Sequence, residues 1–288
     1  MTKFLLISDT HWGSDSDGYK VQPKYGSKLP ELLTALQDWI DENGSIDFIL
    51  HGGDMIHTLD EESLTGANER FDLSIPVHLC LGNHDLTIKD GLSLWLDQSA
   101  QFFEGGSPDY AVETKDVTIH VIPNQYEEDA YYWGTEQNYH YKPSQLEILE
   151  ARLTQAPHKP QVILTHCPVH AIEPSQSGLD KPFHEPPKNF TETVVSLAEE
   201  HNVACVLGAH SHANMHKELN GTHYVTVSSF VETPFEFKCF EVENGRIQMK
   251  THNLWSRIGF DAEYNWDKTF AQGRACDRSF VRESVNPR

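Results

Sequence analysis

Cysteine is scarce in this chain. The 288 residues include five cysteines, and no two of them form a CxxC pair. An odd number without paired spacing argues against a disulfide framework and against a zinc site built from thiolates. We therefore predict buried free thiols, which are typical of a reducing compartment.

Basic residues and long apolar runs are scarce as well. The 22 Lys and Arg residues are outnumbered by 43 Asp and Glu residues, which gives a net charge of −21. Nucleic-acid-binding proteins usually present a basic face, so we expect no nucleic-acid partner. No apolar stretch approaches the roughly 20 residues that span a bilayer, and the N-terminus lacks the apolar region of a secretory signal. We expect a cytoplasmic protein with no membrane partner.

Five short apolar runs, each followed by a residue that can bind a metal ion, are the main feature that the sequence does contain. They cover residues 4–8, 48–52, 78–82, 162–165 and 205–209. Short apolar runs bounded by turn residues are typical of buried strands. Side chains just past the carboxyl ends of neighbouring strands converge in open α/β sheets. Two Asp, one Asn and several His would then gather at one rim, and this mixture suits a divalent metal.

Helical periodicity alternates with these strands. Apolar residues recur at helical spacing in 29–42, 92–103, 143–155 and 190–201. Further strands are predicted at 224–227, 235–240 and 246–250, with a tight turn at 243–245 and a second hairpin over 110–122. The alternation is typical of βαβ units, and the late strands are typical of antiparallel pairing. We therefore predict an α/β (α+β) fold with two mixed sheets and helices outside them.

The predicted globular domain covers residues 1–255. Residues 256–288 form a polar C-terminal extension, which we expect to wrap the domain, to join a homodimer or to be partly disordered. Segments 13–28 and 167–189 lack periodicity, and such loops are either lids and specificity loops or passive surface connections. The aromatic residues at 131–133 are interpreted as core or interface rather than as a surface that stacks on a base.

Short motifs place oxygen and nitrogen ligands at the strand ends. Asp9 and His11 are two residues apart, so on an extended segment both side chains point the same way, and His210 and His212 repeat this spacing. Asp54 follows two glycines, which let the backbone turn closely at a strand end. Each motif alone is weak evidence. Their joint occurrence at consecutive strand ends indicates a metal site.

The order of these motifs resembles the binuclear metallophosphoesterase (calcineurin-like phosphoesterase) superfamily. The matching pattern is D-x-H, G-G-D, G-N-H-D, a strand-end histidine and H-x-H, and it extends from residue 3 to about residue 250. The layout also resembles, more weakly, the class III cyclic nucleotide phosphodiesterases and the bacterial glycerophosphodiesterases. The resemblance implies a four-layer αββα sandwich with a metal site at the carboxyl ends of the strands. One departure is Ala209, where the family usually has glycine directly before the H-x-H pair.

The resemblance also implies how two metal ions would be bound. One ion is expected to be held by Asp9, His11, Asp54 and His212. The other is expected to be held by Asp54, Asn83, His166 and His210, so that Asp54 bridges the two. These oxygen and nitrogen ligands suit two transition-metal ions, divalent or trivalent, such as Mn, Fe, Zn or Co.

The remaining motif residues are expected to act on the substrate. The resemblance implies that His84 reaches the phosphate or the leaving oxygen and that Asp85 helps to orient it. The candidate substrate contacts are Asn83, His84, Trp12 and His184. Two cations roughly 3.5–4 Å apart can convert a shared water into hydroxide and neutralise the phosphate. A histidine has a suitable pKa to protonate the leaving alkoxide.

The predicted function is metal-dependent hydrolysis of a small phosphodiester, of the cyclic nucleotide or glycerophosphodiester type, by a metal-bridging hydroxide. A phosphomonoesterase with the same two-metal site is the main alternative. A nuclease is less favoured because no basic track is evident. A non-catalytic scaffold is less favoured because the sequence retains every ligand of the motif set.

Overall fold

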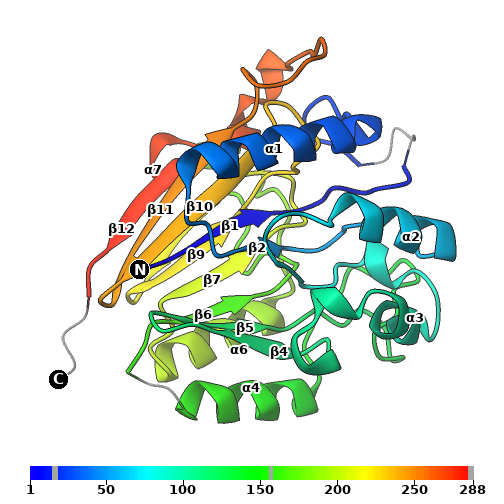
Figure 1. Cartoon of the computed structure of the whole chain (residues 1–288). Coiled ribbons are helices and arrows are strands. Elements are labelled where there is room, and N and C mark those ends of the chain that lie inside the picture. Colours follow the sequence, from blue (N-terminus) through cyan, green and yellow to red (C-terminus); the bar gives the residue numbers. More distant parts are fainter. Residues whose placement is uncertain (15–18, 156–157, 285–288) are drawn as a thin grey trace.

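Two six-stranded sheets pack face to face, with helices on their outer sides (Figure 1). The computed structural model describes residues 1–14, 19–155 and 158–284. In spatial order the first sheet comprises β12 (Ser279–Arg282), β11 (Arg246–Asn253), β10 (Glu236–Glu243), β1 (Thr2–Ile7), β2 (Phe48–His51) and β3 (Val77–Leu79). The second comprises β4 (Tyr110–Glu113), β5 (Thr118–Val121), β6 (Gln161–Leu164), β7 (Cys205–Gly208), β9 (Thr222–Thr226) and β8 (Met215–Leu219). Both sheets are mixed, so the predicted αββα fold is confirmed.

The helices form the two outer layers. The longer ones are α1 (Leu29–Asn43), α2 (Glu61–Arg70), α3 (Gly91–Gln98), α4 (Pro143–Gln155) and α6 (Lys188–Glu200). The short ones are α5 (Pro174–Ser177), α7 (Ala275–Arg278) and the 3₁₀ turns η1 (Gly26–Lys28), η2 (His84–Leu86), η3 (Ala100–Phe102), η4 (Glu104–Gly106) and η5 (Trp266–Gln272). Figure 1 shows α1 above the pair of sheets and α4 below it. Trp39 of α1 packs edge-on against Phe237 of β10, with ring centroids 4.9 Å apart, so α1 covers the first sheet.

Three of the four predicted helices match α1, α4 and α6 to within two residues at each end. The helix predicted over 92–103 is the exception. In the structure α3 ends at Gln98, because Ser99 adopts a φ of −135°, and a 3₁₀ turn follows. Within the described ranges, no helix is both long and apolar enough to cross a membrane.

The apolar pattern carries no signal for α2, β8 and β12. The buried residues of α2 are Leu64, Gly66 and Ala67, so its apolar face is too narrow to produce a clear period. The strands β8 and β12 lie at the edges of their sheets and contain mostly polar or partly exposed residues. They therefore lack the apolar runs that mark the buried strands.

Both predicted hairpins are confirmed. Asn244 and Gly245 have φ values of 52° and 81°, as a two-residue type I′ turn requires, and β10 pairs with β11 on either side of them. The strands β4 and β5 form the other hairpin. The strands that precede the motif residues are parallel neighbours, β1 to β3 in one sheet and β6 to β7 in the other. Their carboxyl ends therefore lie together.

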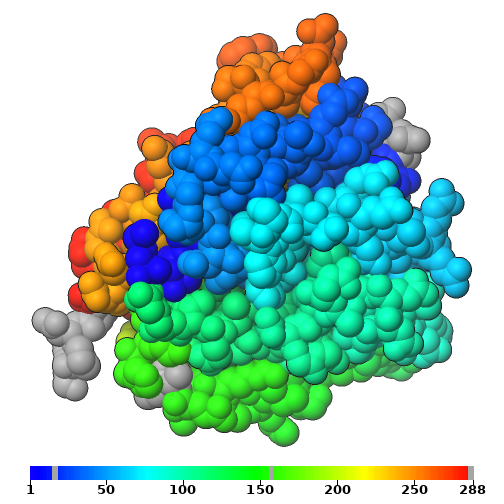
Figure 2. Space-filling model, in the orientation of Figure 1, coloured from blue at the N-terminus to red at the C-terminus, as the bar shows by residue number. Residues whose placement is uncertain are grey.

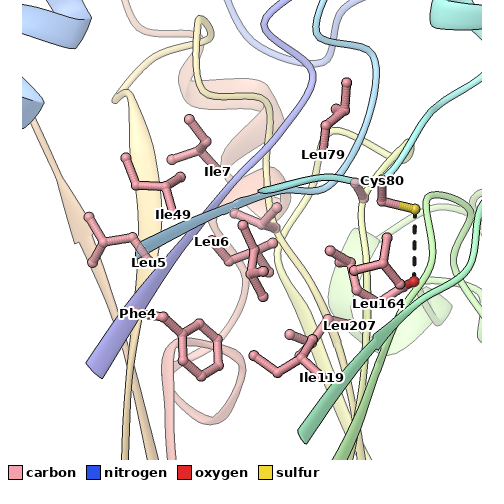
Figure 3. Close-up of a cluster of buried hydrophobic side chains, with 14 of the residues drawn as sticks. Phe4, Leu5, Leu6, Ile7, Ile49, Leu79, Cys80, Ile119, Leu164 and Leu207 are labelled. Carbon is pink, nitrogen blue, oxygen red and sulfur yellow. Dashed lines mark hydrogen bonds between the residues drawn. The ribbon is translucent and has the colours of Figure 1, made fainter. Parts of the chain in front are cut away.

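The core fills the space between the sheets. Figure 3 shows Phe4 and Leu6 of β1 directed toward the strands of the second sheet, which contribute Ile119, Leu164 and Leu207. Phe4 also stacks between Phe48 and Phe240 on the neighbouring strands, with ring centroids 5.3 Å and 4.9 Å apart. The predicted buried free thiols are confirmed for Cys80, Cys167, Cys205 and Cys239, whereas Cys276 is exposed.

The segment after residue 255 adds to the first sheet. Its strand β12 pairs with β11, and its helix α7 is anchored by Lys238 of β10. This lysine is fully buried, and its ammonium donates hydrogen bonds to Thr251 Oγ1 at 3.0 Å and to the Asp277 carbonyl at 3.3 Å. Part of the segment, orange in Figure 2, projects above α1. The four terminal residues of the predicted extension, 285–288, lie outside the described part of the chain.

We expect Phe4→Ala to reduce the free energy of unfolding by roughly 3–5 kcal/mol, because it leaves a cavity between the sheets and removes two ring contacts. Denaturant titration followed by circular dichroism measures the change. Val281→Ala, at a position that is 45% exposed on β12, is the matched control and should cost less than about 0.5 kcal/mol. Equal effects of the two substitutions would contradict the assignment of Phe4 to the core.

Candidate metal centre

All seven predicted ligands lie just past strand ends and face one region of the structure. Asp9 and His11 follow β1, and Asp54 and Asn83 follow β2 and β3 in the same sheet. The other three follow strands of the second sheet, His166 after β6, then His210 and His212 after β7. Five of the seven line a single cavity of about 420 Å³, namely His11, Asp54, Asn83, His210 and His212. The remaining two, Asp9 and His166, are fully buried behind them.

Among the described residues, His11, His57 and His84 form one group of candidate ligand atoms, and two further clusters consist of predicted ligands alone. In the first, one donor atom each from Asp9, His11 and His212 lies within 4.8 Å of the others. In the second, the same holds for Asp54, His166 and His210. The clusters adjoin at Asp54, whose Oδ2 lies 3.4 Å from His166 Nε2 and 3.8 Å from His11 Nε2. This position suits the bridging role predicted for Asp54.

The donor atoms fit metal ions better than they fit one another. Asp9 Oδ1 and Asn83 Oδ1 are buried and have no hydrogen-bond partner among the described residues. Ring nitrogens also approach closely, with 3.4 Å between His11 Nε2 and His212 Nε2 and 3.2 Å between His166 Nε2 and His210 Nδ1. Buried oxygen and nitrogen lone pairs are costly unless they are satisfied. Cations placed between them would satisfy them, and this donor set suits transition metals.

The histidines of the two clusters differ in pKa. Burial opposes protonation of His166, but the adjacent Asp54 carboxylate outweighs it and raises the pKa of His166 to about 9. Burial likewise opposes protonation of His212, and the Glu232 and Asp9 carboxylates raise its pKa to about 10. Burial lowers the pKa of His210 to about 3. A metal ion entering either cluster must therefore displace a proton.

Five of the seven proposed ligands have a backbone conformation with positive φ, in the left-handed region. The φ values are 53° at Asp9, 44° at His11, 52° at Asp54, 61° at His210 and 52° at His212. The extended geometry predicted for the D-x-H and H-x-H pairs is therefore wrong. The side chains of these five ligands converge because each of the five sits in a tight turn, and non-glycine residues in this conformation cost on the order of 1 kcal/mol or more each.

Two glycines make the approach of the ligands sterically feasible. Gly53 has a φ of 111°, and a Cβ there would lie 2.4 Å from His166 Nδ1. A Cβ on Gly82 would lie 2.3 Å from Asp54 Oδ1. The prediction that glycines allow close backbone turns at these strand ends is confirmed. Ala209, the departure from the family pattern, is fully buried, and its N–H donates to the His166 carbonyl at 2.7 Å.

His84 is held by its backbone and by one ring nitrogen. Its N–H donates to Asp54 Oδ1 at 2.8 Å, and its Nδ1 lies 2.7 Å from the His57 carbonyl. A carbonyl can only accept, so Nδ1 carries the proton and Nε2 is the ring nitrogen left for the cavity, which His84 lines. The His57 ring in turn approaches His11, with 3.4 Å between their Nδ1 atoms.

Asp85 supports the loop backbone. Its carboxylate accepts hydrogen bonds from Ile56 N at 3.1 Å and from Gly82 N at 2.8 Å, and its carbonyl accepts from Trp95 Nε1 at 2.8 Å. Burial raises the pKa of Asp85 to about 8. The structure therefore places this side chain against the turns that carry Asp54 and Asn83, whereas the ring of His84 is oriented by His57.

The two other predicted substrate contacts lie in different places. His184 lines the cavity, and its Nε2 lies 2.8 Å from the hydroxyl of Tyr19. Trp12 lies in an adjoining groove against α2, where Arg70 stacks over its ring at 4.8 Å. Of these two residues, the structure brings His184 but not Trp12 to the wall of the cavity.

Several residues at the site have no signal in the sequence. Tyr19, Lys24 and Tyr139 line the cavity but belong to irregular segments, and Trp133 belongs to the aromatic cluster 131–133, which is interpreted from the sequence as core or interface. Glu232 is buried, and its Oε1 lies 2.5 Å from His212 Nδ1. Its Oε2 accepts from the N–H groups of residues 21 and 22, at 2.9 Å and 2.6 Å. Glu232 therefore orients a predicted ligand and ties down the loop that carries Lys24.

Comparisons with known proteins identify the family and agree with the fold. The calcineurin-like phosphoesterase family model matches residues 2–214. The fold is similar to that of a purple acid phosphatase from yellow lupin (Lupinus luteus) seeds, at 16% identity and a TM-score of 0.62, over 97% of this chain and 53% of that chain. It is also similar to GAP50, the anchor in the inner membrane complex of Plasmodium, at 14% identity and a TM-score of 0.61, over 92% of this chain and 87% of that chain.

A third similar structure is a putative 5′-nucleotidase from Staphylococcus aureus, at 13% identity and a TM-score of 0.56, over 94% of this chain and 57% of that chain. This chain thus spans only about half the length of the lupin and staphylococcal structures. No curated protein sequence matches it.

Two clusters of Asp and His at the carboxyl ends of the paired sheets could hold metal ions. This chain belongs to the calcineurin-like phosphoesterase family, because the family match covers well over half of it. The resemblance in the motif order is confirmed. Family membership supports metal-dependent hydrolysis of a phosphoric ester as the class of activity.

We expect Glu232→Gln to weaken metal binding about 10- to 100-fold, because the neutral amide no longer holds the His212 ring by a charge-assisted hydrogen bond. Chelator competition with the purified, metal-loaded protein measures the affinity. Glu192→Gln, on an exposed side chain of α6, is the matched control. Unchanged metal affinity in a folded Glu232→Gln protein would show that Glu232 does not support the ligand.

Proposed function

We propose that this protein is a metal-dependent phosphoesterase that hydrolyses a small phosphodiester. The observation that carries the proposal is the joining of two ligand clusters at Asp54, in a cavity that His84 also lines. The cavity volume of about 420 Å³ suits a small molecule. We assign the metal ligands as Asp9, His11, Asp54, Asn83, His166, His210 and His212.

Bound metal ions would supply a nucleophile from water and neutralise the phosphate. The residues of the chain supply orientation and proton handling. The His84 N–H fixes the Asp54 carboxylate, and the His57 carbonyl fixes the His84 ring with Nε2 toward the cavity. From there Nε2, when it also carries a proton, can donate a hydrogen bond to a phosphoryl oxygen or transfer that proton to the leaving oxygen. His57 therefore contacts both the candidate acid His84, through its carbonyl, and the ligand His11, through its ring.

The charges of the side chains at the site favour a diester over a monoester. Asp9, Asp54 and Glu232 are buried and contribute three negative charges, and Lys24 in the cavity wall contributes one positive charge. Glu185 also lines the cavity, but it is exposed, so water and salt screen its charge. With the buried carboxylates and Lys24 alone, two divalent ions would leave a surplus of two positive charges. An anionic nucleophile and a singly charged phosphodiester balance that surplus. A doubly charged monoester would leave an uncompensated negative charge, which is unfavourable away from water.

One observation favours a phosphomonoesterase as the second candidate. Lys24 Nζ forms neither a hydrogen bond nor an ion pair with any residue that the structure describes, although it lines the cavity beside Asp54. It is therefore available to bind an additional phosphoryl oxygen. The similarity to GAP50, described as an anchor, is the reason to test catalysis directly, because fold alone does not establish activity.

We expect the purified protein to contain close to two transition-metal ions and to hydrolyse bis(p-nitrophenyl) phosphate faster than p-nitrophenyl phosphate. Asp54→Ala should abolish hydrolysis and lower the metal content while the circular dichroism spectrum is retained, because both clusters lose a shared ligand. Metal analysis and p-nitrophenol release measure these outcomes, with Asp72→Ala as an exposed control. A fully metallated protein that hydrolyses neither ester would exclude the proposed activity.

His84→Ala should retain both metal ions and lose turnover by about 10²- to 10⁴-fold, as expected when a general acid or a hydrogen-bond donor is removed. Metal content and kcat on bis(p-nitrophenyl) phosphate are measured on the same sample. His158→Ala, at an exposed position, is the matched control. Loss of metal from the His84→Ala protein would instead assign His84 to metal binding.

A further inference from the structure

Three aromatic rings form one side of the cavity. The His57 ring stacks on His84 with centroids 4.5 Å apart and an interplanar angle of 23°. The Trp133 indole lies 5.0 Å from the His84 ring at an angle of 48°. All three residues line the same cavity. An aromatic surface therefore begins beside the candidate phosphate position and extends over Trp133.

Trp133 is positioned by hydrogen bonds on both sides. Its backbone N–H donates to the Leu86 carbonyl at 2.7 Å, at the end of the turn that begins with His84. The Glu127 carboxylate accepts hydrogen bonds from the N–H groups of residues 134–136, at 3.0 Å, 3.4 Å and 3.4 Å. The orientation of the indole is therefore set by the loop itself and does not need a ligand.

The Trp133 indole is suited to stacking. Its indole N–H donates to the Glu136 carbonyl at 2.9 Å, so its single hydrogen-bonding group is occupied. The two preceding aromatic residues point elsewhere. Tyr131 hydrogen-bonds to Asp109, and Tyr132 packs against Lys89, whose Nζ lies 5.5 Å from the ring centroid. Trp133 packs partly buried against the apolar core, as the core interpretation of residues 131–133 predicts, and it also lines the cavity.

Resting on the proposed function, we propose that Trp133 stacks on a planar aromatic substituent of the phosphoric ester and thereby selects this class of substrate. Trp133 borders His84, so the substituent is the one attached to the oxygen that His84 faces. Stacking of an aromatic ring on indole strengthens binding about five- to tenfold. A glycerol-like substituent has no planar face and gains no such contact, so esters with an aromatic group are favoured over glycerophosphodiesters.

The test compares two phosphonates that share an anchor for the metal ions but differ in planarity. Phenylphosphonate and cyclohexylphosphonate are titrated into the metal-loaded full chain by calorimetry, which needs no turnover. We expect the wild-type protein to prefer the phenyl compound about fivefold. Trp133→Leu should bring the ratio close to one, and Trp133→Phe should give an intermediate ratio. Trp266→Leu, at a position that is 79% exposed, is the matched control and should keep the wild-type ratio.

The proposal is overturned if the wild-type protein binds both phosphonates equally or binds neither. It is also overturned if Trp133→Leu keeps the preference while melting at the wild-type temperature. Should that variant fail to fold, an unchanged ratio for Trp133→Phe overturns the proposal in its place. Hydrolysis of bis(p-nitrophenyl) phosphate is scored separately. A protein that shows the stacking preference but hydrolyses no ester would overturn the proposed function and leave standing only the stacking of a planar group on Trp133.

Discussion

The placement of Asp54 between two sheets is the constraint on which the rest of the site depends. One carboxylate oxygen is fixed by the His84 N–H at 2.8 Å, and the other lies between His166 and His11. His166 follows a strand of the second sheet, and His11 follows a strand of the first. Asp54 can occupy this position only because its flanking turns contain Gly53 and Gly82, where a Cβ would collide with the ligands. Each cluster contains ligands from both sheets, so any change in the packing of one sheet on the other would alter the distances between ligand atoms within both clusters.

The conformations that aim the ligands are unfavourable in isolation. Five of the seven proposed ligands have positive φ, and two buried ligand oxygens lack a hydrogen-bond partner within the described ranges. Strain of this kind persists where the surrounding structure determines the geometry. Here the surroundings are rigid, because the sheets share one continuous apolar core and backbone hydrogen bonds join residues 9–12 to 53–55. Natural sequences commonly break local rules at functional sites and compensate elsewhere, and this site follows that pattern.

Segments distant in sequence form the walls of the cavity. The loop that carries Tyr19 and Lys24 is joined to the ligand His212 through Glu232, and Tyr19 meets His184 from the long loop after β6. Trp133 forms another part of the cavity wall, and the backbone after it is held by the Glu127 carboxylate. The proposed metal ligands thus lie in turns at the strand ends, whereas the other side chains that line the cavity come mostly from longer loops. Loops vary more readily than strands, which explains how one fold serves many substrates.

The sequence by itself determined most of the strands, most of the longer helices and the set of proposed ligands. It could do so because buried strands leave apolar runs and the motif residues directly follow them. Only the tertiary structure decided that Glu232 orients His212, that the His57 carbonyl sets the tautomer of His84, and that Trp133 rather than Trp12 lines the cavity. These assignments depend on contacts between residues that are 20 or more positions apart, for which local patterns carry no information. The left-handed geometry of the ligands also arises from such contacts, since it is imposed by the hydrogen bonds between neighbouring turns.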